Sequence, residues 1–215
     1  MTAELGRENF CGEYNMTQLC ALCAVFLLLM ATAPARGEKH SEEDIVKFWN
    51  TSDLIWTTYT TSREAHLCKA DQKTNINERN ITFYRAHIED GRWQIGEYNG
   101  TFRHYYNKND TPYDAVRIQS KDRRVKAREI LHYQSEDSSC AVFWTVTSNR
   151  YQLTPAYELR VKDTYIKNEH SPKSECWDKF ETLIRRRKAW RTYYENCHTV
   201  PNKKLMSSIS MKRRQ

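Results

Sequence analysis

Eight short segments rich in β-branched and aromatic residues follow one another along the middle of the chain, with polar, Asn, Asp or Gly breaks between them. They lie near 54–61, 64–70, 81–88, 93–102, 113–119, 125–134, 140–147 and 156–162. No helix-length amphipathic segment separates any two of them, so the sheet should be antiparallel, with hairpin turns at Asp90-Gly91 and Asn99-Gly100. Their number and spacing suit an up-and-down barrel or a sandwich, and an eight-stranded barrel has room for one small ligand.

Helical patterns flank these segments on both sides. Ser41-Glu42-Glu43-Asp44 precedes the apolar residues of 45–49, which predicts a short N-terminal helix. From Ser174 to Trp190 apolar residues recur at three- and four-residue steps, which predicts a C-terminal α-helix packed outside the barrel. Its opposite face would carry the four successive cations Arg185 to Lys188. The expected fold class is therefore all-β, an eight-stranded antiparallel barrel with these two helices.

The first 35 residues have the features of a signal peptide. Leu19–Met30 is an apolar run of 12 residues, too short to span a bilayer, and small residues follow it, which fits cleavage after Ala35. Translation from Met16 is the better fit, because residues 1–15 carry three Glu against one Arg. We therefore expect a secreted, extracellular protein without a membrane span.

Cleavage would leave a basic mature chain. Residues 36–200 form one expected domain and residues 201–215 a flexible basic tail. The net charge rises from +7 to +9, because one Arg and three Glu are removed. We expect the mature chain to be a monomer.

The mature chain retains four cysteines, which indicates two disulfides in a secreted protein. All three pairings of four cysteines are open on spacing alone. No Cys-x-x-Cys remains, and His66 near Cys68 and the Cys197-His198 pair are poor zinc motifs, so no metal is expected. Four Asn-x-Ser/Thr sequences predict glycosylation, at Asn50, Asn80, Asn99 and Asn109.

Several function classes lack their motifs. Six glycines without a phosphate-binding cluster disfavour a nucleotide cofactor, and no cofactor is expected. The His-Glu-x-x-His and Gly-x-Ser-x-Gly motifs are absent, and no free cysteine is left for catalysis, so an enzyme is not expected. The Arg185–Lys188 stretch invites a glycosaminoglycan or a host protein as partner, whereas no nucleic-acid-binding motif accompanies it.

The cysteine-bearing segments resemble the tick salivary lipocalins of the histamine-binding group. That family has Cys-Asp and two aliphatic positions, a gap, and then Glu-aliphatic-Trp; this chain has Cys140-Ala141-Val142-Phe143, a gap of 14 residues, and Glu158-Leu159-Arg160. Leu67-Cys68, Ser174-Glu175-Cys176-Trp177 and Glu195-Asn196-Cys197 resemble the family's other cysteine segments. The resemblance implies a lipocalin barrel with Cys68 paired to Cys197 and Cys140 to Cys176.

The resemblance also implies an amine site inside the barrel. In the family, the Glu and Trp of the motif line the amine pocket, and Glu129 resembles a second acidic position on the preceding strand. Here Glu158 is kept, but Ala141 replaces the Asp and Arg160 replaces the Trp. Residues two apart in a strand share a face, so Arg160 would either neutralise Glu158 or receive a ligand carboxylate.

Alternation places Glu129 on a face with Ala127, Leu131 and Tyr133. Aromatic residues of the strands complete the candidate ligand site. The full candidate set is Glu158, Glu129, Arg160, Tyr157, Trp56, Tyr59 and Phe143.

These features lead to one function and two alternatives. We expect a secreted salivary lipocalin that sequesters a small host mediator, by resemblance a biogenic amine such as histamine or serotonin, and so suppresses host inflammation and defence. The first alternative is a lipid mediator such as a leukotriene, a fatty acid or cholesterol, held through Arg160. The second is a protein-binding immune modulator.

Overall fold

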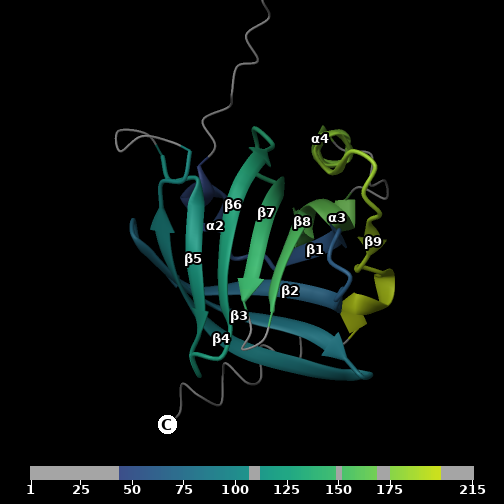
Figure 1. The fold of residues 1–215 in the computed structure, drawn as a ribbon, viewed down its shortest axis with the longest axis horizontal. Helices are drawn as coiled ribbons and strands as arrows, with labels where there is room; N and C mark the ends of the chain where they lie inside the picture. The colour runs from purple at the N-terminus through teal and green to yellow at the C-terminus, as the bar shows by residue number, and fades with distance from the viewer. Residues whose placement is uncertain (1–43, 107–111, 149–151, 169–174, 200–215) are drawn as a thin grey trace, which may run out of the picture. The chain divides into compact units, whose positions relative to one another are not determined.

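The eight expected strands close into one antiparallel barrel (Figure 1). The computed structural model describes residues 44–106, 112–148, 152–168 and 175–199. The strands are β1 (Ile55–Thr60), β2 (Leu67–Ile76), β3 (Asn80–Glu89), β4 (Arg92–Arg103), β5 (Ala115–Ser120), β6 (Lys126–Gln134), β7 (Cys140–Ser148) and β8 (Leu153–Lys162). From β2 to β8 each strand pairs with its sequence neighbour, and β1 pairs with both β8 and β2. Closure leaves none of the eight strands with a free edge along its whole length, and the expected fold class is confirmed.

Most strand bounds agree with the expected ones, and β2 differs most. It runs to Ile76, six residues beyond the expected end, through a polar stretch of low strand propensity. Pairing with β3 accounts for the extension, since Asn75 faces Thr82 and Ile76 faces Ile81 across the hairpin.

One of the two expected turns is present and the other is wrong. Asp90 and Gly91 form a two-residue turn between β3 and β4, with φ angles of 49° and 71° that suit Asp-Gly. Asn99 and Gly100 instead lie within β4. Gly100 is required there for packing, because a Cβ atom would lie 2.7 Å from methyl carbons of both Ile81 and Val116.

Helix α2 (Ile45–Trp49) closes one end of the barrel. Its N-cap is Asp44, whose Oδ1 accepts hydrogen bonds from the backbone N–H groups of Val46 and Lys47 at 3.0 and 3.1 Å. Residues 41–43 of the expected helix start lie outside the described residues. Phe48 and Trp49 are fully buried, with ring centroids 5.3 Å from Phe143 and 4.9 Å from Phe83. The apolar half of the barrel interior is thus filled by α2 and the strand residues around it.

The C-terminal helix is shorter than expected. Helix α4 (Glu175–Ile184) ends before the basic stretch, and Arg185 adopts a left-handed φ of 55°. The expected continuation of this helix from 185 to Trp190 is therefore wrong. A further helical turn made of four successive cations would place no apolar residue against the barrel. Trp190 and Arg191 form the short strand β9 (Trp190–Arg191), which pairs with β1. The expected N-cap Ser174 lies outside the described residues.

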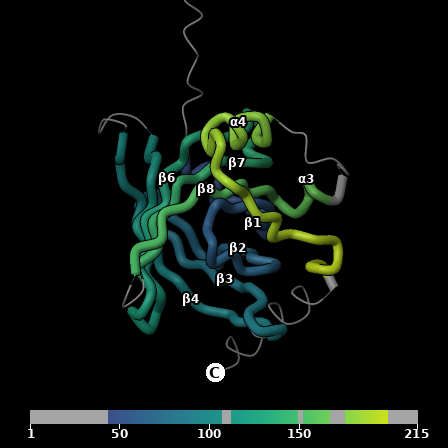
Figure 2. The backbone as a smooth tube through the Cα atoms, turned by 45° about the vertical axis from the view of Figure 1, so that its right-hand side comes forward, coloured from purple at the N-terminus to yellow at the C-terminus, as the bar shows by residue number. Residues whose placement is uncertain are grey.

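The C-terminal segments pack on the outside of the barrel, as expected. Figure 2 shows α4 beside β7 and the last segment running past β1, together with α3 (Asp163–Asn168) and the 3-10 helix η1 (Glu195–Thr199). Phe180 of α4 is fully buried in a cluster with residues of β7 and β8.

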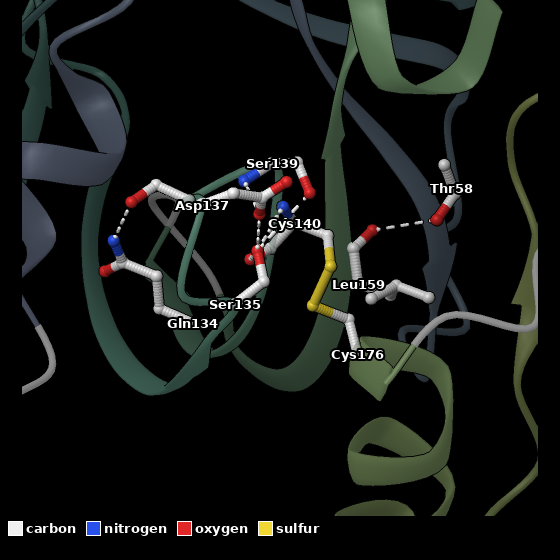
Figure 3. The surroundings of a disulfide bond; sticks show 9 residues. Thr58, Gln134, Ser135, Asp137, Ser139, Cys140, Leu159 and Cys176 are labelled. Carbon is white, nitrogen blue, oxygen red and sulfur yellow. Dashed lines mark hydrogen bonds between the residues drawn. A yellow bond between two sulfur atoms is a disulfide. The ribbon is translucent and has the colours of Figure 1, made fainter. Parts of the chain in front are cut away.

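Two disulfides hold these segments, and both pairings implied by the resemblance are present. Cys68 of β2 is bonded to Cys197 of η1, with Cα atoms 5.3 Å apart. Cys140 of β7 is bonded to Cys176 of α4, with Cα atoms 6.1 Å apart (Figure 3). Each bond ties a C-terminal element to a barrel strand.

Candidate functional site

A pocket of about 210 Å³ opens at the end of the barrel opposite α2. Its mouth is formed by the segment between β1 and β2, including Ser62, Glu64 and His66. Threonine hydroxyls from β1, β7 and β8 line its walls, and Tyr98 of β4 contributes an aromatic ring. The volume lies below the ~300–1,000 Å³ of sites for drug-sized ligands, so the pocket suits a small ligand.

A layer of buried charges lies in the middle of the barrel, and three of its members, Lys69, Arg85 and Glu158, line the pocket. We call this set the charge layer: the acids Asp71, Glu129 and Glu158 and the bases Lys69, Arg85 and Arg160. Three positive and three negative side chains balance, and every carboxylate contacts at least one cation. Buried charges are tolerated when they are paired and hydrogen-bonded in this way.

Arg160 is the centre of the charge layer and is 0% exposed. Its Nη1 and Nη2 donate to the two carboxylate oxygens of Glu129 at 2.6 and 2.8 Å. Its Nε and Nη2 donate to Oε2 of Glu158 at 3.0 and 2.6 Å. The guanidinium therefore has its polar atoms on carboxylates, and Arg160 does not line the pocket.

Arg85 joins the other two acids. Its Nε and Nη2 donate to the two oxygens of Asp71 at 2.6 and 2.7 Å, and Nη2 also donates to Glu129 at 2.9 Å. Unlike Arg160, Arg85 lines the pocket. No hydrogen bond from its Nη1 is found among the described residues, which leaves two N–H donors for a ligand.

Lys69 completes the layer. Its Nζ donates to Oε1 of Glu158 at 2.6 Å. Both side chains line the pocket, with 16% and 8% of their surface exposed.

The pKa values follow from these contacts. Burial favours the neutral form of Glu158, but the charges of Lys69 and Arg160 outweigh it and lower the pKa to about 2. Burial likewise opposes ionisation of Glu129, yet Arg160 and Arg85 hold its pKa well below the usual range. Burial lowers the pKa of Lys69, and Glu158 offsets this only in part. Both Glu side chains are therefore ionised at neutral pH.

Two histidines stand at the side of the pocket, with ring centroids 4.2 Å apart. Burial lowers the pKa of His66, and burial together with His66, Lys69 and Arg85 lowers the pKa of His87 to about 4. Both rings are neutral at pH 7, so each offers one donor and one acceptor.

The structure separates the seven predicted ligand-site residues into two groups. Glu158, Glu129, Arg160 and Phe143 face the interior, with Phe143 below the guanidinium of Arg160 at 4.6 Å from ring centroid to Cζ. The other three lie on the outer face, namely Trp56, Tyr59 and Tyr157. Of the seven, only Glu158 lines the pocket.

Local contacts explain the outward positions. The indole N–H of Trp56 donates to Asp163 at 2.9 Å, and the ring of Tyr59 packs on Trp177 of α4 at 4.5 Å. Register shifts between Thr57 and Tyr59 and between Leu131 and Tyr133 break the alternation. The second shift makes the expected shared face of Glu129 and Tyr133 wrong, since Tyr133 packs in the outer cluster with Cys140.

Lys69, Asp71 and Arg85 were not predicted. Ile81, Phe83 and Arg85 alternate on the inner face of β3. A cation at the third position of this otherwise apolar face was the sequence feature that could have indicated a buried charge. For β2 the signal is hidden, because Cys68 has a positive φ of 53° and the pairing shifts between Leu67 and Ala70.

Asn50, Asn80 and Asn99 are exposed, as a glycan acceptor must be, and Asn109 lies outside the described residues. In the described part of the chain no helix is long and apolar enough to cross a membrane. Nor does this part gather three His, Cys, Asp or Glu side chains in a geometry that fits a metal ion.

A closed eight-stranded antiparallel barrel with a helix outside and a ligand-sized pocket at one end defines a lipocalin. Within that class, the chain belongs to the tick histamine-binding protein family, whose sequence model matches residues 32–199. No curated protein matches the chain significantly in sequence.

The solved structures that match this chain are distant from it in sequence. The protein AM182, solved in complex with serotonin, is 18% identical, with a TM-score of 0.52 over 71% of this chain and 90% of that one. A variant of bovine odorant-binding protein is 14% identical, with a TM-score of 0.44 over 64% and 89% of the two chains. A dog lipocalin allergen is 11% identical, with a TM-score of 0.46 over 65% and 88%. At 18% identity the likeness to AM182 concerns the fold alone.

Proposed function

We propose that this protein is a non-catalytic carrier that holds a small amine in the barrel pocket, with the ligand ammonium on Oε1 of Glu158. The observation that carries the proposal is the 2.6 Å contact between this oxygen and the ammonium of Lys69. A primary ammonium is thus already stabilised in the pocket. Membership of the histamine-binding family and the serotonin bound to AM182 support the same ligand class.

The rest of the pocket suits the other end of such a ligand. Neutral His66 and His87 can each donate or accept a hydrogen bond, and Tyr98 offers a ring against which an imidazole or indole can pack. The threonine hydroxyls add further donors and acceptors. Buried polar groups of this kind orient a ligand and reject analogues that leave them unpaired.

The biological role follows from binding alone. A secreted protein in molar excess over a mediator lowers its free concentration by mass action, without turnover. Secretion is supported by the signal-like residues 1–35 and by the two disulfides, which persist in oxidising compartments. Removal of histamine or serotonin at a bite site would suppress host inflammation.

Calorimetric titration of the oxidised protein with histamine and serotonin tests the proposal. Glu158→Gln should abolish measurable binding, because the neutral amide removes the counter-charge of the ammonium. Glu78→Gln, an exposed position in the turn between β2 and β3, is the matched control and should bind as the wild type does. Equal amine affinity in Glu158→Gln and wild type would refute the assignment of the site.

A second candidate ligand is a small acid. It is favoured by the free Nη1 of Arg85 and by Lys69, which place cationic donors in the pocket. Arg160 is not the receiving group, because it is buried behind Glu158 and Glu129. Binding of a short-chain carboxylate without binding of histamine would favour this candidate over the amine, whereas a lipid acid such as leukotriene B4 exceeds the 210 Å³ of the pocket.

A further inference from the structure

Lys69 occupies the position that the proposed ligand ammonium requires. We propose that Lys69 sets the affinity of the pocket for amines: its ammonium is an internal competitor, and a ligand amine binds Glu158 only by displacing it. This inference rests on the proposed function.

The two oxygens of Glu158 have different surroundings. Oε2 accepts two hydrogen bonds from the buried guanidinium of Arg160, at 3.0 and 2.6 Å. Oε1 accepts from Lys69 alone among the described residues. Since Glu158 lines the pocket and Arg160 does not, Oε1 is the oxygen that a ligand can reach. The other interior acids, Asp71 and Glu129, are 1% exposed and do not line the pocket.

Lys69 is also the cation of the charge layer that can leave most readily. Its ammonium makes one side-chain hydrogen bond within the described residues, whereas Arg85 makes three and Arg160 four. A lysine ammonium is a point charge on a flexible four-carbon stem, whereas both arginines are held in fixed fork geometry. The displaced ammonium would remain near the pocket mouth, where Glu64 is an exposed partner.

Exchange keeps the charges of the barrel balanced. The ligand brings one ammonium and Lys69 withdraws one, so three acids still face three bases in the layer. Binding of an amine is therefore weakened by the lost Lys69 contact, and only a ligand that also uses the ring and hydroxyl groups of the pocket gains enough to replace it. The penalty is the same for every amine, so it raises the interaction energy that any amine must supply, and an aromatic amine that also uses the ring and hydroxyl groups reaches this threshold where a simple alkylamine does not.

The test compares wild type with Lys69→Met and Lys69→Arg in a titration with histamine. Methionine keeps the length of the stem and removes the competitor, so affinity for histamine should rise by about tenfold or more, since one charge-assisted hydrogen bond no longer has to be broken. Arginine makes a stronger, two-armed contact with a carboxylate, so Lys69→Arg should bind more weakly than the wild type. Lys73→Met is the matched control, because this lysine lies farther along β2, donates to Asn50 and does not line the pocket.

If the wild type binds histamine and Lys69→Met binds it equally or more weakly, the inference about Lys69 is overturned. The proposed function would then still stand. Binding by Lys69→Met alone would support the inference, because the lysine then blocks the site outright. If neither protein binds histamine, the proposed function fails as well.

A second measurement covers a Lys69→Met protein that does not fold. In the full wild-type protein labelled with ¹³C-lysine, saturating histamine should shift the Lys69 side-chain resonance toward that of an exposed lysine. A Lys69 resonance that does not move in the histamine-bound protein would overturn the inference.

Discussion

Replacement of Arg160 tests whether the charge layer holds the barrel together. Arg160→Met removes four hydrogen bonds and leaves Glu129 and Glu158 to share Arg85 and Lys69. Methionine fills part of the volume between Phe143 and Trp49, so the main loss is electrostatic. Removal of one partner from a buried ion pair costs about 3–5 kcal/mol, which for a domain of this size lowers the melting temperature by about 6–20 °C.

The pH dependence separates this electrostatic loss from a packing loss. The pKa of Glu158 is about 2 in the folded protein, below its usual 4.5, so its contribution is present above about pH 4.5 and is lost as the pH falls toward 2. Burial without Arg160 would raise the pKa of both glutamates, so the variant takes up protons at a higher pH. The difference in unfolding free energy between wild type and Arg160→Met should therefore be largest near pH 7 and smaller near pH 4.

Urea denaturation of the oxidised proteins, followed by tryptophan fluorescence at pH 7 and pH 4, measures both quantities. Arg124→Met is the control, because this arginine is 71% exposed and lies 3.4 Å from an exposed Asp122, so water screens the pair. Glu129→Gln added to Arg160→Met should recover part of the loss by removing an unpaired charge. An Arg160→Met protein within about 1 kcal/mol of wild type at pH 7 would refute the assigned role of the layer.

Two further predictions concern the disulfides and the histidine pair. Replacing Cys68 and Cys197 by Ser should lower the free energy of unfolding by about 5 kcal/mol, because this disulfide closes a segment of 129 residues. Replacing Cys140 and Cys176 by Ser should lower it by about 4 kcal/mol, because the segment spans 36 residues. Chemical denaturation of the two double variants compares the losses, and a larger loss for the shorter segment would contradict the prediction. The pKa of His87 is about 4 in the folded protein and 6.5 when unperturbed, so its contribution to stability is complete above about pH 6.5 and is lost as the pH falls to 4. His87→Gln should therefore reduce the change in unfolding free energy between pH 6.5 and pH 4. An unchanged pH dependence of the unfolding free energy would show that His87 does not titrate as stated.

The fold was predictable because its signals are local. Short β-rich segments, the Asp90-Gly91 turn and four cysteines each limit the chain independently, and they agree on one antiparallel barrel. The helix beyond Ile184 was predicted wrongly because the apolar spacing continues to Trp190, while β9 pairing with β1 offers the same residues a better contact.

The site was predictable only where alternation is unbroken. Glu158 and Arg160 stand two apart in a regular part of β8, and the structure places both inside. Trp56 and Tyr59 lie on opposite sides of a register shift in β1, so the alternation of side chains along this strand does not give the face on which each one lies. No single-sequence signal marks such a shift, because it depends on how the neighbouring strands pair.

Lys69 shows why the ligand question needed the three-dimensional arrangement. Read by itself, Arg160 in place of an aromatic residue indicates either a neutralised Glu158 or a receiver for a carboxylate, and these lead to opposite ligands. Glu129 takes two arms of the guanidinium, so Arg160 neutralises only one oxygen of Glu158. The other oxygen is left to a residue 89 positions away, on a strand whose face cannot be read from its sequence. Whether the pocket accepts an amine therefore depends less on Arg160 than on how strongly Lys69 holds Glu158.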